Sequence, residues 1–475
     1  MSQIQYVPLS PIDPHRFESV LSAEQYAALL HLIEDGAREL RERVVWNVNS
    51  TARGGGVVEL LKPLLGYSRG AGVDARWAVI HADAPFFTLT KRLHNHLHGF
   101  NGDGGPLGER ERLHYEHVLS QCSAELAPLI RPADVVILHD PQTAGMVEAI
   151  RRTGATVIWR CHVGRDHRNQ YAYEAWEFLR DYVLGADAFV FSRDAFAWPG
   201  LPADRVAVIH PSIDAFSPKN QHQTREQTLA ILSASRLIPD DATHGSFVSS
   251  DGTPGRVDRH AIMVQERPVP EDATVVAQIS RWDRLKDPIG LLRAFAQHVH
   301  GATDAHLILA GPSTVAVADD PEGAEVLDSV VGAWHRLPAD VRAHVHLASL
   351  PMDDVDENAA IVNALQRRAD VIVQKSLAEG FGLTVAEAMW KSRPVVASAI
   401  GGIRDQIVDG ESGVLLHHPR DPAECGAAIV RLLRDPPHAA QIGQAAHIRV
   451  RDHFLGPYHL QSYFELIQRL VRQPA

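Results

Sequence analysis

Residues 43–72, RVVWNVNSTARGGGVVELLKPLLGYSRGAG, contain the pattern from which the fold can be predicted. The apolar run at 43–50 indicates a buried strand, a Gly-rich turn follows it, and the next stretch has the composition of a helix. This order of apolar run, turn and helix-like stretch recurs along the chain. β-Branched runs separated by helices are typical of a parallel sheet covered on both faces. The sequence therefore predicts a doubly wound α/β protein.

The other apolar runs fall into two groups, so we expect two sheets. The first group continues at 75–82, 133–140, 155–162, 187–193 and 205–212. The second comprises 273–280, 305–312, 343–349, 369–376 and 393–400, with a further candidate at 412–419. Residues 221–270 between them are polar and irregular, and 240–260 are the most loop-like part.

Two Rossmann-like domains are therefore expected. The N-terminal domain covers 1–216, and an amphipathic helix at 456–475 is expected to pack back on it; the C-terminal domain covers 217–455. Two such domains facing each other would form a cleft lined by the carboxyl ends of strands, where open α/β sheets bind ligands. Residues that directly follow strands are thus the first candidates for chemistry.

Composition excludes several classes of protein. The net charge of −12 offers no basic face for nucleic acid. No apolar run approaches the roughly 20 residues that span a bilayer, and no basic start followed by an apolar core marks a secretory signal. The three cysteines, Cys122, Cys161 and Cys425, are too few and too scattered for a disulfide framework. We expect a cytoplasmic protein with neither nucleic-acid nor membrane partners; a homodimer is left open.

The histidines of HNHLHG (His94, His96 and His98) invite a metal hypothesis. Their alternation suits neighbouring helix turns poorly, and no acidic residue has ligand spacing beside them. We interpret them as solvated or hydrogen-bonding side chains.

A run of three glycines, Gly54, Gly55 and Gly56, follows the first strand and opens a helix. Amides at a helix N-terminus carry partial positive charge, and glycine lets a ligand approach them closely, which favours a phosphate. A flexible turn that needs a positive φ explains the run equally well. The run is neither a Walker loop nor a dinucleotide fingerprint.

Two cations follow the strand at 273–280. Arg281 and Lys286 lie five residues apart around a turn, where they can straddle a diphosphate through charge-assisted hydrogen bonds. The alternative is a solvated basic turn whose cations pair with Asp283 and Asp287.

Residues 375–390, KSLAEGFGLTVAEAMW, place two carboxylates around a Gly-rich bend. Glu379 precedes the bend, and Glu387 lies about a turn and a half into the following helix. Carboxylates accept hydrogen bonds from sugar diols well, because they are pure acceptors with several lone pairs. The alternative is a helix-start acid followed by a solvated helix acid.

Polar residues also end the strands of the first domain. Asn49, His139, Asp140, Arg160 and His162 all lie at or just after predicted strand ends. That position makes them functional candidates, although a single histidine is often only a hydrogen-bonded polar group.

Together, ISRWDRLKDP, KSLAEGFGLTVAEAMW, PVVASAIGGIRDQIVDGESGVLL and the Gly-rich loop resemble the retaining GT-B glycosyltransferases related to sucrose and glycogen synthases. That family carries two glutamates separated by seven residues, as Glu379 and Glu387 are. LHDPQTAGM and IWRCH narrow the resemblance to the trehalose glycosyltransferring synthases. DGTPGRVDRHA and SRWDRLKDP are also similar to the retaining trehalose phosphorylases. The resemblance covers about 44–465.

The resemblance implies a role for each candidate residue. Arg281 and Lys286 would hold the donor phosphates, in place of a metal, and stabilise the leaving diphosphate. Glu379 would bind hydroxyls of the transferred glucose, and Glu387 the ribose diol. His162 would lie near the anomeric centre. The remaining donor-side residues implied are Gly55, Gly56, Phe381, Gly382 and Leu383, and the acceptor-side residues are Asn49, Asp140, Gln142 and Arg160.

The activity implied is reversible transfer of glucose from ADP- or UDP-glucose to glucose, which gives α,α-trehalose with retained configuration. No cofactor or metal is implied; the aspartate pairs 319–320 and 353–354 lie in loops of the wrong fold type for one. The first alternative is phosphorolysis of trehalose to α-glucose 1-phosphate. A second, of another class, is a nucleotide-sugar sensor without activity. A NAD-binding protein is disfavoured because neither half has Gly-x-Gly-x-x-Gly with an acid about 20 residues on.

Overall fold

The computed structural model describes residues 2–52, 55–239, 244–314 and 321–472. The chain divides into two compact units, which are described separately: unit 1 comprises residues 1–212 and 454–475, and unit 2 comprises 213–453. The sequence had placed the boundaries at 216/217 and 455/456. No helix within the described ranges is long and apolar enough to cross a membrane.

Unit 1 is built on a seven-stranded sheet in the order β1-β3-β2-β4-β5-β6-β7. Only β1 runs antiparallel to its neighbour. The strands are β1 (Ile4–Val7), β2 (Val44–Asn49), β3 (Asp74–Ile80), β4 (Val135–His139), β5 (Thr156–Cys161), β6 (Ala188–Phe191) and β7 (Val206–Val208). The helices are α1 (Ala23–Glu39), α2 (Gly56–Gly70), α3 (Ala84–Leu97), α4 (Glu109–Leu126), α5 (Asp140–Thr143), α6 (Val147–Arg151), α7 (Gln170–Val183) and α17 (Gly456–Arg472).

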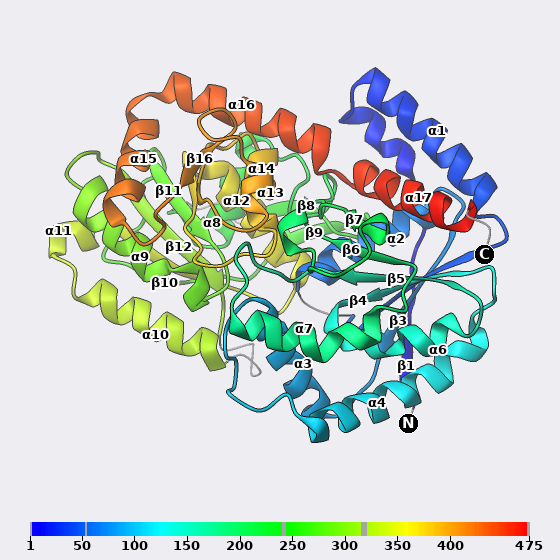
Figure 1. The fold of residues 1–475 in the computed structure, drawn as a ribbon. Coiled ribbons are helices and arrows are strands. Elements are labelled where there is room, and N and C mark those ends of the chain that lie inside the picture. Colours follow the sequence, from blue (N-terminus) through cyan, green and yellow to red (C-terminus); the bar gives the residue numbers. More distant parts are fainter. Residues whose placement is uncertain (1, 53–54, 240–243, 315–320, 473–475) are drawn as a thin grey trace. The chain divides into compact units, whose positions relative to one another are not determined.

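Helices cover both faces of this sheet. Side chains alternate between the faces along each strand, so neighbouring residues of one strand pack in opposite cores. Trp46 and Val48 of β2 belong to the core shared with α3, α4 and α7. Val45 of the same strand packs in the opposite core with Leu466 and Ile467 of α17. Figure 1 shows α3, α4 and α7 on one side of the sheet and α1 with α17 on the other. The C-terminal helix is therefore part of the core of unit 1.

Unit 2 has a second seven-stranded sheet in the order β10-β13-β12-β11-β14-β15-β16, in which only β10 is antiparallel. Its strands are β10 (Ile262–Val264), β11 (Val275–Ile279), β12 (His306–Pro312), β13 (Val345–Leu350), β14 (Val371–Gln374), β15 (Val395–Ser398) and β16 (Val414–Leu416). Its helices are α8 (Arg225–Ala234), α9 (Pro288–Ala294), α10 (Pro321–His335), α11 (Ala339–Arg342), α12 (Val355–Arg368), α13 (Leu383–Trp390), α14 (Ile403–Gln406), α15 (Pro422–Arg434) and α16 (Pro436–His453). The core with α9, α10 and α15 covers one face, and α12 contacts β11 from the other. The doubly wound architecture is as predicted.

Residues 240–243 of the loop expected at 240–260 lie outside the described residues, and the expectation was wrong for the two strands found in the rest. Two strands, β8 (Gly245–Val248) and β9 (Pro254–Val257), form an antiparallel hairpin there. Alternate residues of β8 are buried and exposed, with Phe247 facing in. The stretch between Ser249 and Thr253 supplies the tight turn. Short strands at the edge of a domain carry few apolar residues, so composition alone resembles a loop.

Candidate active site

In both units, the candidate residues gather where the strand order reverses. In unit 1 the chain passes from β2 to β3 on one side and then to β4 on the other side of β2. In unit 2, β11 leads to β12 on one side, and β14 lies on its other side. A reversal of this kind leaves a crevice at the carboxyl ends of the two central strands, where α/β sheets bind ligands.

In unit 1, a chain of hydrogen bonds runs through two imidazoles. His162 Nε2 lies 3.1 Å from His139 Nδ1, and His139 Nε2 lies 3.0 Å from Asn47 Oδ1. The Arg160 guanidinium Nε–H reaches His162 Nδ1 at 3.5 Å. One assignment satisfies every contact: each ring is neutral and donates from Nε2, His162 to His139 and His139 to Asn47.

Burial agrees with neutral rings. Desolvation, followed by the nearby Arg160 cation, lowers the pKa of His139 to about 3. The same causes, in the same order, hold the pKa of His162 well below its usual value. Both rings are therefore uncharged at neutral pH. Both ring nitrogens of His162 are hydrogen-bonded, one to His139 and the other to Arg160. His162 can therefore hydrogen-bond to a sugar only if it gives up one of these partners.

Asp140 directly follows β4 in a backbone conformation that is uncommon for residues other than glycine, although aspartate tolerates it better than most. Its φ of 63° lies in the left-handed region, where non-glycine residues cluster at functional sites. Its Oδ1 accepts the backbone N–H of His162 at 2.7 Å. Burial nevertheless raises the pKa of Asp140 to about 7. The residue is thus placed as a carboxyl group whose charge changes near neutral pH.

The other predicted residues of unit 1 occupy different depths. Arg160 is fully buried, and its guanidinium also donates to Phe191 O at 3.2 Å and Ser192 Oγ at 3.3 Å. Asn49 is buried, and its Oδ1 accepts the indole N–H of Trp77 at 2.8 Å. Gln142 is half-buried on α5. Arg160 therefore orients His162, and Asn49 is already engaged within the domain.

The Gly-rich loop begins α2. Gly54 lies outside the described residues. Gly55 is the N-cap with φ 84°, and a Cβ built on it would meet open space. The glycine is therefore required by the backbone conformation and not by crowding, and Gly56 starts a helix whose first amides lack a side-chain cap. Both original interpretations of the loop, turn and phosphate site, remain compatible with this geometry.

In unit 2, ion pairs replace the neutral rings. Lys286 Nζ forms a salt bridge with Glu379, and the two side chains are only 16% and 12% exposed. Ser376 Oγ donates to the same carboxylate at 3.2 Å. Arg281 is different, because its side chain is 65% exposed and it contacts Asp283 at 3.0 Å. The structure thus brings Lys286 and Glu379 together, and the alternative of a solvated basic turn describes Arg281 alone.

A second salt bridge joins the same two loops, and the sequence did not reveal it. Asp287, next to Lys286, pairs with the fully buried Lys375. Asp287 adopts φ 49° and caps α9 by accepting Gly290 N–H at 3.1 Å. The backbone N–H of Leu377 donates to Leu285 O at 2.6 Å, which also joins the two loops. These contacts fix the loop after β11 against the loop after β14.

Glu387 is buried within α13, with a side chain 3% exposed. Lys219 Nζ lies 3.7 Å from its Oε1, while its buried Oε2 makes no hydrogen bond to a described residue. The buried Lys391 Nζ donates to the Glu387 carbonyl at 3.1 Å. A carboxylate with a buried oxygen that lacks a partner is costly unless a ligand satisfies it. The alternative of a solvated helix acid does not fit Glu387.

The bend between the glutamates supplies the N-terminus of α13. Gly382 is the N-cap with φ 86° and has no side-chain cap, so the first amides of the helix, from Leu383 on, are unoccupied by a capping side chain. Phe381 is buried, and its carbonyl accepts Gln406 Nε2 at 2.6 Å. The helix start therefore combines partial positive charge with a fixed backbone.

The metal candidates have other hydrogen-bond roles where the structure describes them. His96 is buried and contacts Asn101 O at 3.1 Å, and Asp354 caps α12 through Asp356 and Glu357 amides. Residues 319–320 lie outside the described ranges. Within those ranges, no three His, Cys, Asp or Glu side chains are arranged to hold a metal ion.

Comparison with known proteins gives the class. Residues 47–198 match the family model for the N-terminal domain of trehalose synthase, and residues 261–449 match the model for glycosyl transferases group 1. A structure described as "Trehalose-6-phosphate from E. coli bound with UDP-2-fluoro glucose" is 12% identical, covers 91% of this chain and 100% of that chain, and gives a TM-score of 0.66. The fold and these matches define a GT-B glycosyltransferase.

Relatives identify the family. A trehalose synthase from Rubrobacter xylanophilus is 34% identical over 458 residues, which are 96% of both chains. A trehalose phosphorylase from Pleurotus sajor-caju is 24% identical over 85% of this chain but only 54% of its own. The chain belongs to the trehalose synthase family, as the sequence resemblance had implied.

Proposed function

We propose that this protein transfers glucose from a nucleoside-diphosphate glucose, ADP- or UDP-glucose, to free glucose and forms α,α-trehalose with retained configuration. The observation that carries the proposal is the composition of the unit 2 site. Residues 379–387 combine a carboxylate paired with Lys286, an uncapped helix start and a buried carboxylate with an oxygen that lacks a partner among the described residues. These groups match, in turn, a diphosphate, the transferred sugar and a ribose diol.

Each residue then has a specific task. Lys286 and the exposed Arg281 bind the diphosphate, while amides of Phe381, Gly382 and Leu383 contact the sugar or phosphate oxygens. Glu379 accepts hydroxyls of the glucose, and Glu387 accepts the ribose hydroxyls. Lys286 already bonds to Glu379, so one ammonium can serve the carboxylate and the phosphates at once. Positive charge held in place before the reaction stabilises the leaving diphosphate.

The transfer needs no nucleophile from the enzyme. The bond between the anomeric carbon and the phosphate oxygen breaks as the acceptor hydroxyl attacks from the same face. The acceptor proton passes to the departing phosphate oxygen. His162 lies near the anomeric centre, and Gly55 and Gly56 border the donor phosphates and the acceptor. The acceptor side comprises Asn49, Asp140, Gln142 and Arg160. Neutral imidazoles suit an uncharged sugar, and His162 would bond to it after exchanging one of its present partners, His139 or Arg160.

Phosphorolysis of trehalose is the second candidate, and similarity to a trehalose phosphorylase supports it. In that reaction Arg281 and Lys286 would hold one phosphate, and Glu387 would have no ribose to bind. The buried, unpartnered oxygen of Glu387 favours the nucleotide donor.

A donor screen tests the proposal. ADP-, UDP- and GDP-glucose are each incubated with glucose, and the products are separated by chromatography. We expect trehalose and the matching nucleoside diphosphate from at least one donor, with no metal added. Measurable donor binding without turnover across acceptors would instead support a nucleotide-sugar sensor.

A further inference from the structure

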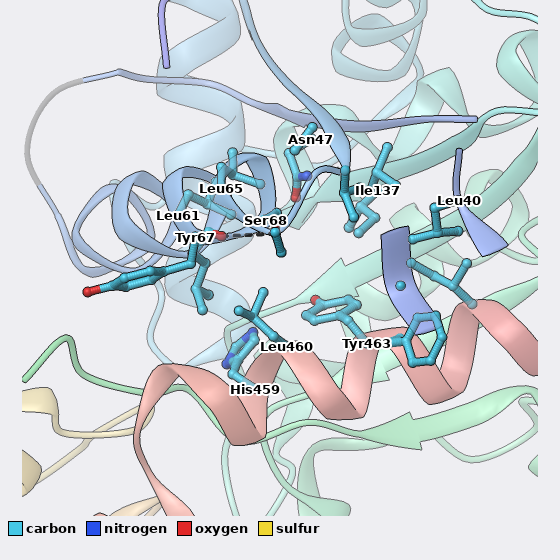
Figure 2. Close-up of a pocket in the computed structure, with 18 of the residues that line it drawn as sticks. Leu40, Asn47, Leu61, Leu65, Tyr67, Ser68, Ile137, His459, Leu460 and Tyr463 are labelled. Atoms are coloured by element: carbon cyan, nitrogen blue, oxygen red, sulfur yellow. Dashed lines mark hydrogen bonds between the residues drawn. The ribbon is translucent and has the colours of Figure 1, made fainter. Parts of the chain in front are cut away.

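A mostly apolar cavity lies within unit 1, between the sheet and the helices α1, α2 and α17. Figure 2 shows Leu61 and Leu65 of α2 on one side and Leu460 and Tyr463 of α17 on the other, with strand residues above them. Leu64 of α2 also lines it. The cavity has a polar end, because His139, His162 and His459 are among its lining residues.

His459 gives this polar end an unsatisfied hydrogen-bond acceptor. The side chain is 4% exposed, and its Nδ1 is buried without a hydrogen bond to a described residue. Burial, followed by the Arg160 cation, holds the pKa of His459 well below its usual value, although the His210 backbone acts in the opposite direction. The ring is therefore neutral and has one donor and one acceptor nitrogen. We assign the acceptor to Nδ1, since it has no partner.

The neighbouring polar groups do not satisfy this nitrogen. Asn47 Oδ1 accepts from His139, and His139 Nδ1 accepts from His162, so these atoms are already bonded to one another. A buried acceptor that makes no hydrogen bond is energetically unfavourable. The apolar wall of the cavity, in contrast, can accommodate a small hydrocarbon group.

We infer that this cavity binds a small amphipathic molecule, whose apolar ring or chain lies among the leucines and whose single hydroxyl or N–H group donates to His459 Nδ1. The inference does not depend on glucosyl transfer, since every lining residue belongs to unit 1 and binding is measured without sugar or nucleotide.

Phenol and toluene form a matched pair of probes, because they differ by a hydroxyl in place of a methyl group. Binding to the full-length protein is measured by saturation-transfer NMR and calorimetry. We expect both to bind the wild type. His459→Phe should weaken phenol about tenfold, as loss of a buried hydrogen bond predicts, and should leave toluene within about twofold.

Filling the cavity gives an independent test. Leu460→Trp and Leu64→Phe should each abolish binding of both probes, while Leu113→Trp, at an exposed site on α4, should leave both unchanged. Two filling variants guard against one that fails to fold. The inference is overturned if neither probe binds the wild type, if His459→Phe affects the two probes equally, or if a folded filling variant still binds them.

Discussion

The two units place their candidate residues at the same topological position but differ in how they treat charge. Unit 1 surrounds its site with neutral imidazoles whose pKa values are lowered and with a carboxyl group whose pKa is raised, so burial suppresses the ionisation of these groups beside the buried Arg160 cation. Unit 2 keeps opposite charges in contact in two adjacent salt bridges. Unit 1 thus presents neutral rings and unit 2 paired charges, which is the division that the proposed transfer of an uncharged sugar from a diphosphate needs.

The largest expected effect comes from removing the cation of unit 2. Lys286→Ala deletes the charge beside the leaving diphosphate and leaves Glu379 without its ammonium partner. We expect kcat/KM for transfer to fall by about 100- to 1,000-fold, as for loss of a preorganised charge-stabilising donor. Steady-state kinetics with the preferred donor measure it.

Arg284→Ala is the matched control. Arg284 lies in the same turn, but its salt bridge with Glu325 is exposed on both sides, so little effect on rate is expected. Equal losses for the two variants would show that the turn, and not the Lys286 charge, matters.

Glu387 sharpens the comparison by separating donors. Glu387→Gln keeps the shape but weakens the acceptor for a ribose diol, and hydrogen bonds to charged groups contribute about 1.5–3 kcal/mol. We expect KM for the nucleotide sugar to rise by roughly 10- to 100-fold, while any phosphorolysis changes far less. Glu411→Gln, at an exposed turn, is the control. If the variant were equally impaired in transfer and in phosphorolysis, Glu387 would not bind the ribose.

Asp140 tests the suppressed ionisation of unit 1. Its native pKa of about 7 lies above the unfolded value of about 3.9, so the native state holds the proton between these values. Wild-type stability should therefore fall as pH rises from about 4 to 7 through this group, and Asp140→Asn should lose that dependence. His139 contributes with the opposite sign, but it is present in both proteins and cancels in their difference.

Denaturant unfolding midpoints of wild type and Asp140→Asn, measured at pH 5 and pH 8, check this prediction. The midpoint of the variant, relative to that of the wild type, should be higher at pH 8 than at pH 5. The exposed Asp204→Asn should show no such gain. A difference that does not change with pH would mean that Asp140 is not buried as a neutral acid.

The smallest effect is expected from chelation. Because a lysine, an arginine and helix amides would neutralise the diphosphate, EDTA should change the transfer rate by less than about twofold. The assay compares chelator-treated protein with and without added magnesium. A transfer rate that is lost with EDTA and restored by magnesium would show that a metal ion neutralises the diphosphate.

Much of the fold follows from local sequence. Buried parallel strands such as 44–49 and 371–374 are continuous apolar runs, and the sequence located each within a few residues. The strands it missed, β1, β8, β9 and β10, pair antiparallel and are short. β1 and β10 are held by pairing with distant residues, which no local pattern records. β8 and β9 pair with each other across the turn at 249–253, in a stretch whose polar composition resembles a loop.

The site was predictable where function requires residues directly after strands. Lys286 and Glu379, 93 residues apart, were both identified and lie in contact. Lys219, Lys375 and Asn47 were missed, because their meaning depends on partners far along the chain. Lys375 directly follows a strand, and that position was the one signal that could have revealed it. The burial of Lys375 makes sense only once Asp287 is known to lie beside it.

The central claim of the proposed function is that unit 2 binds a nucleoside diphosphate. The most direct test incubates the protein with trehalose and either a nucleoside diphosphate or inorganic phosphate, and separates the products by chromatography. The account predicts nucleoside-diphosphate glucose in the first tube and no sugar phosphate in the second. Glucose 1-phosphate formed only with inorganic phosphate would contradict it.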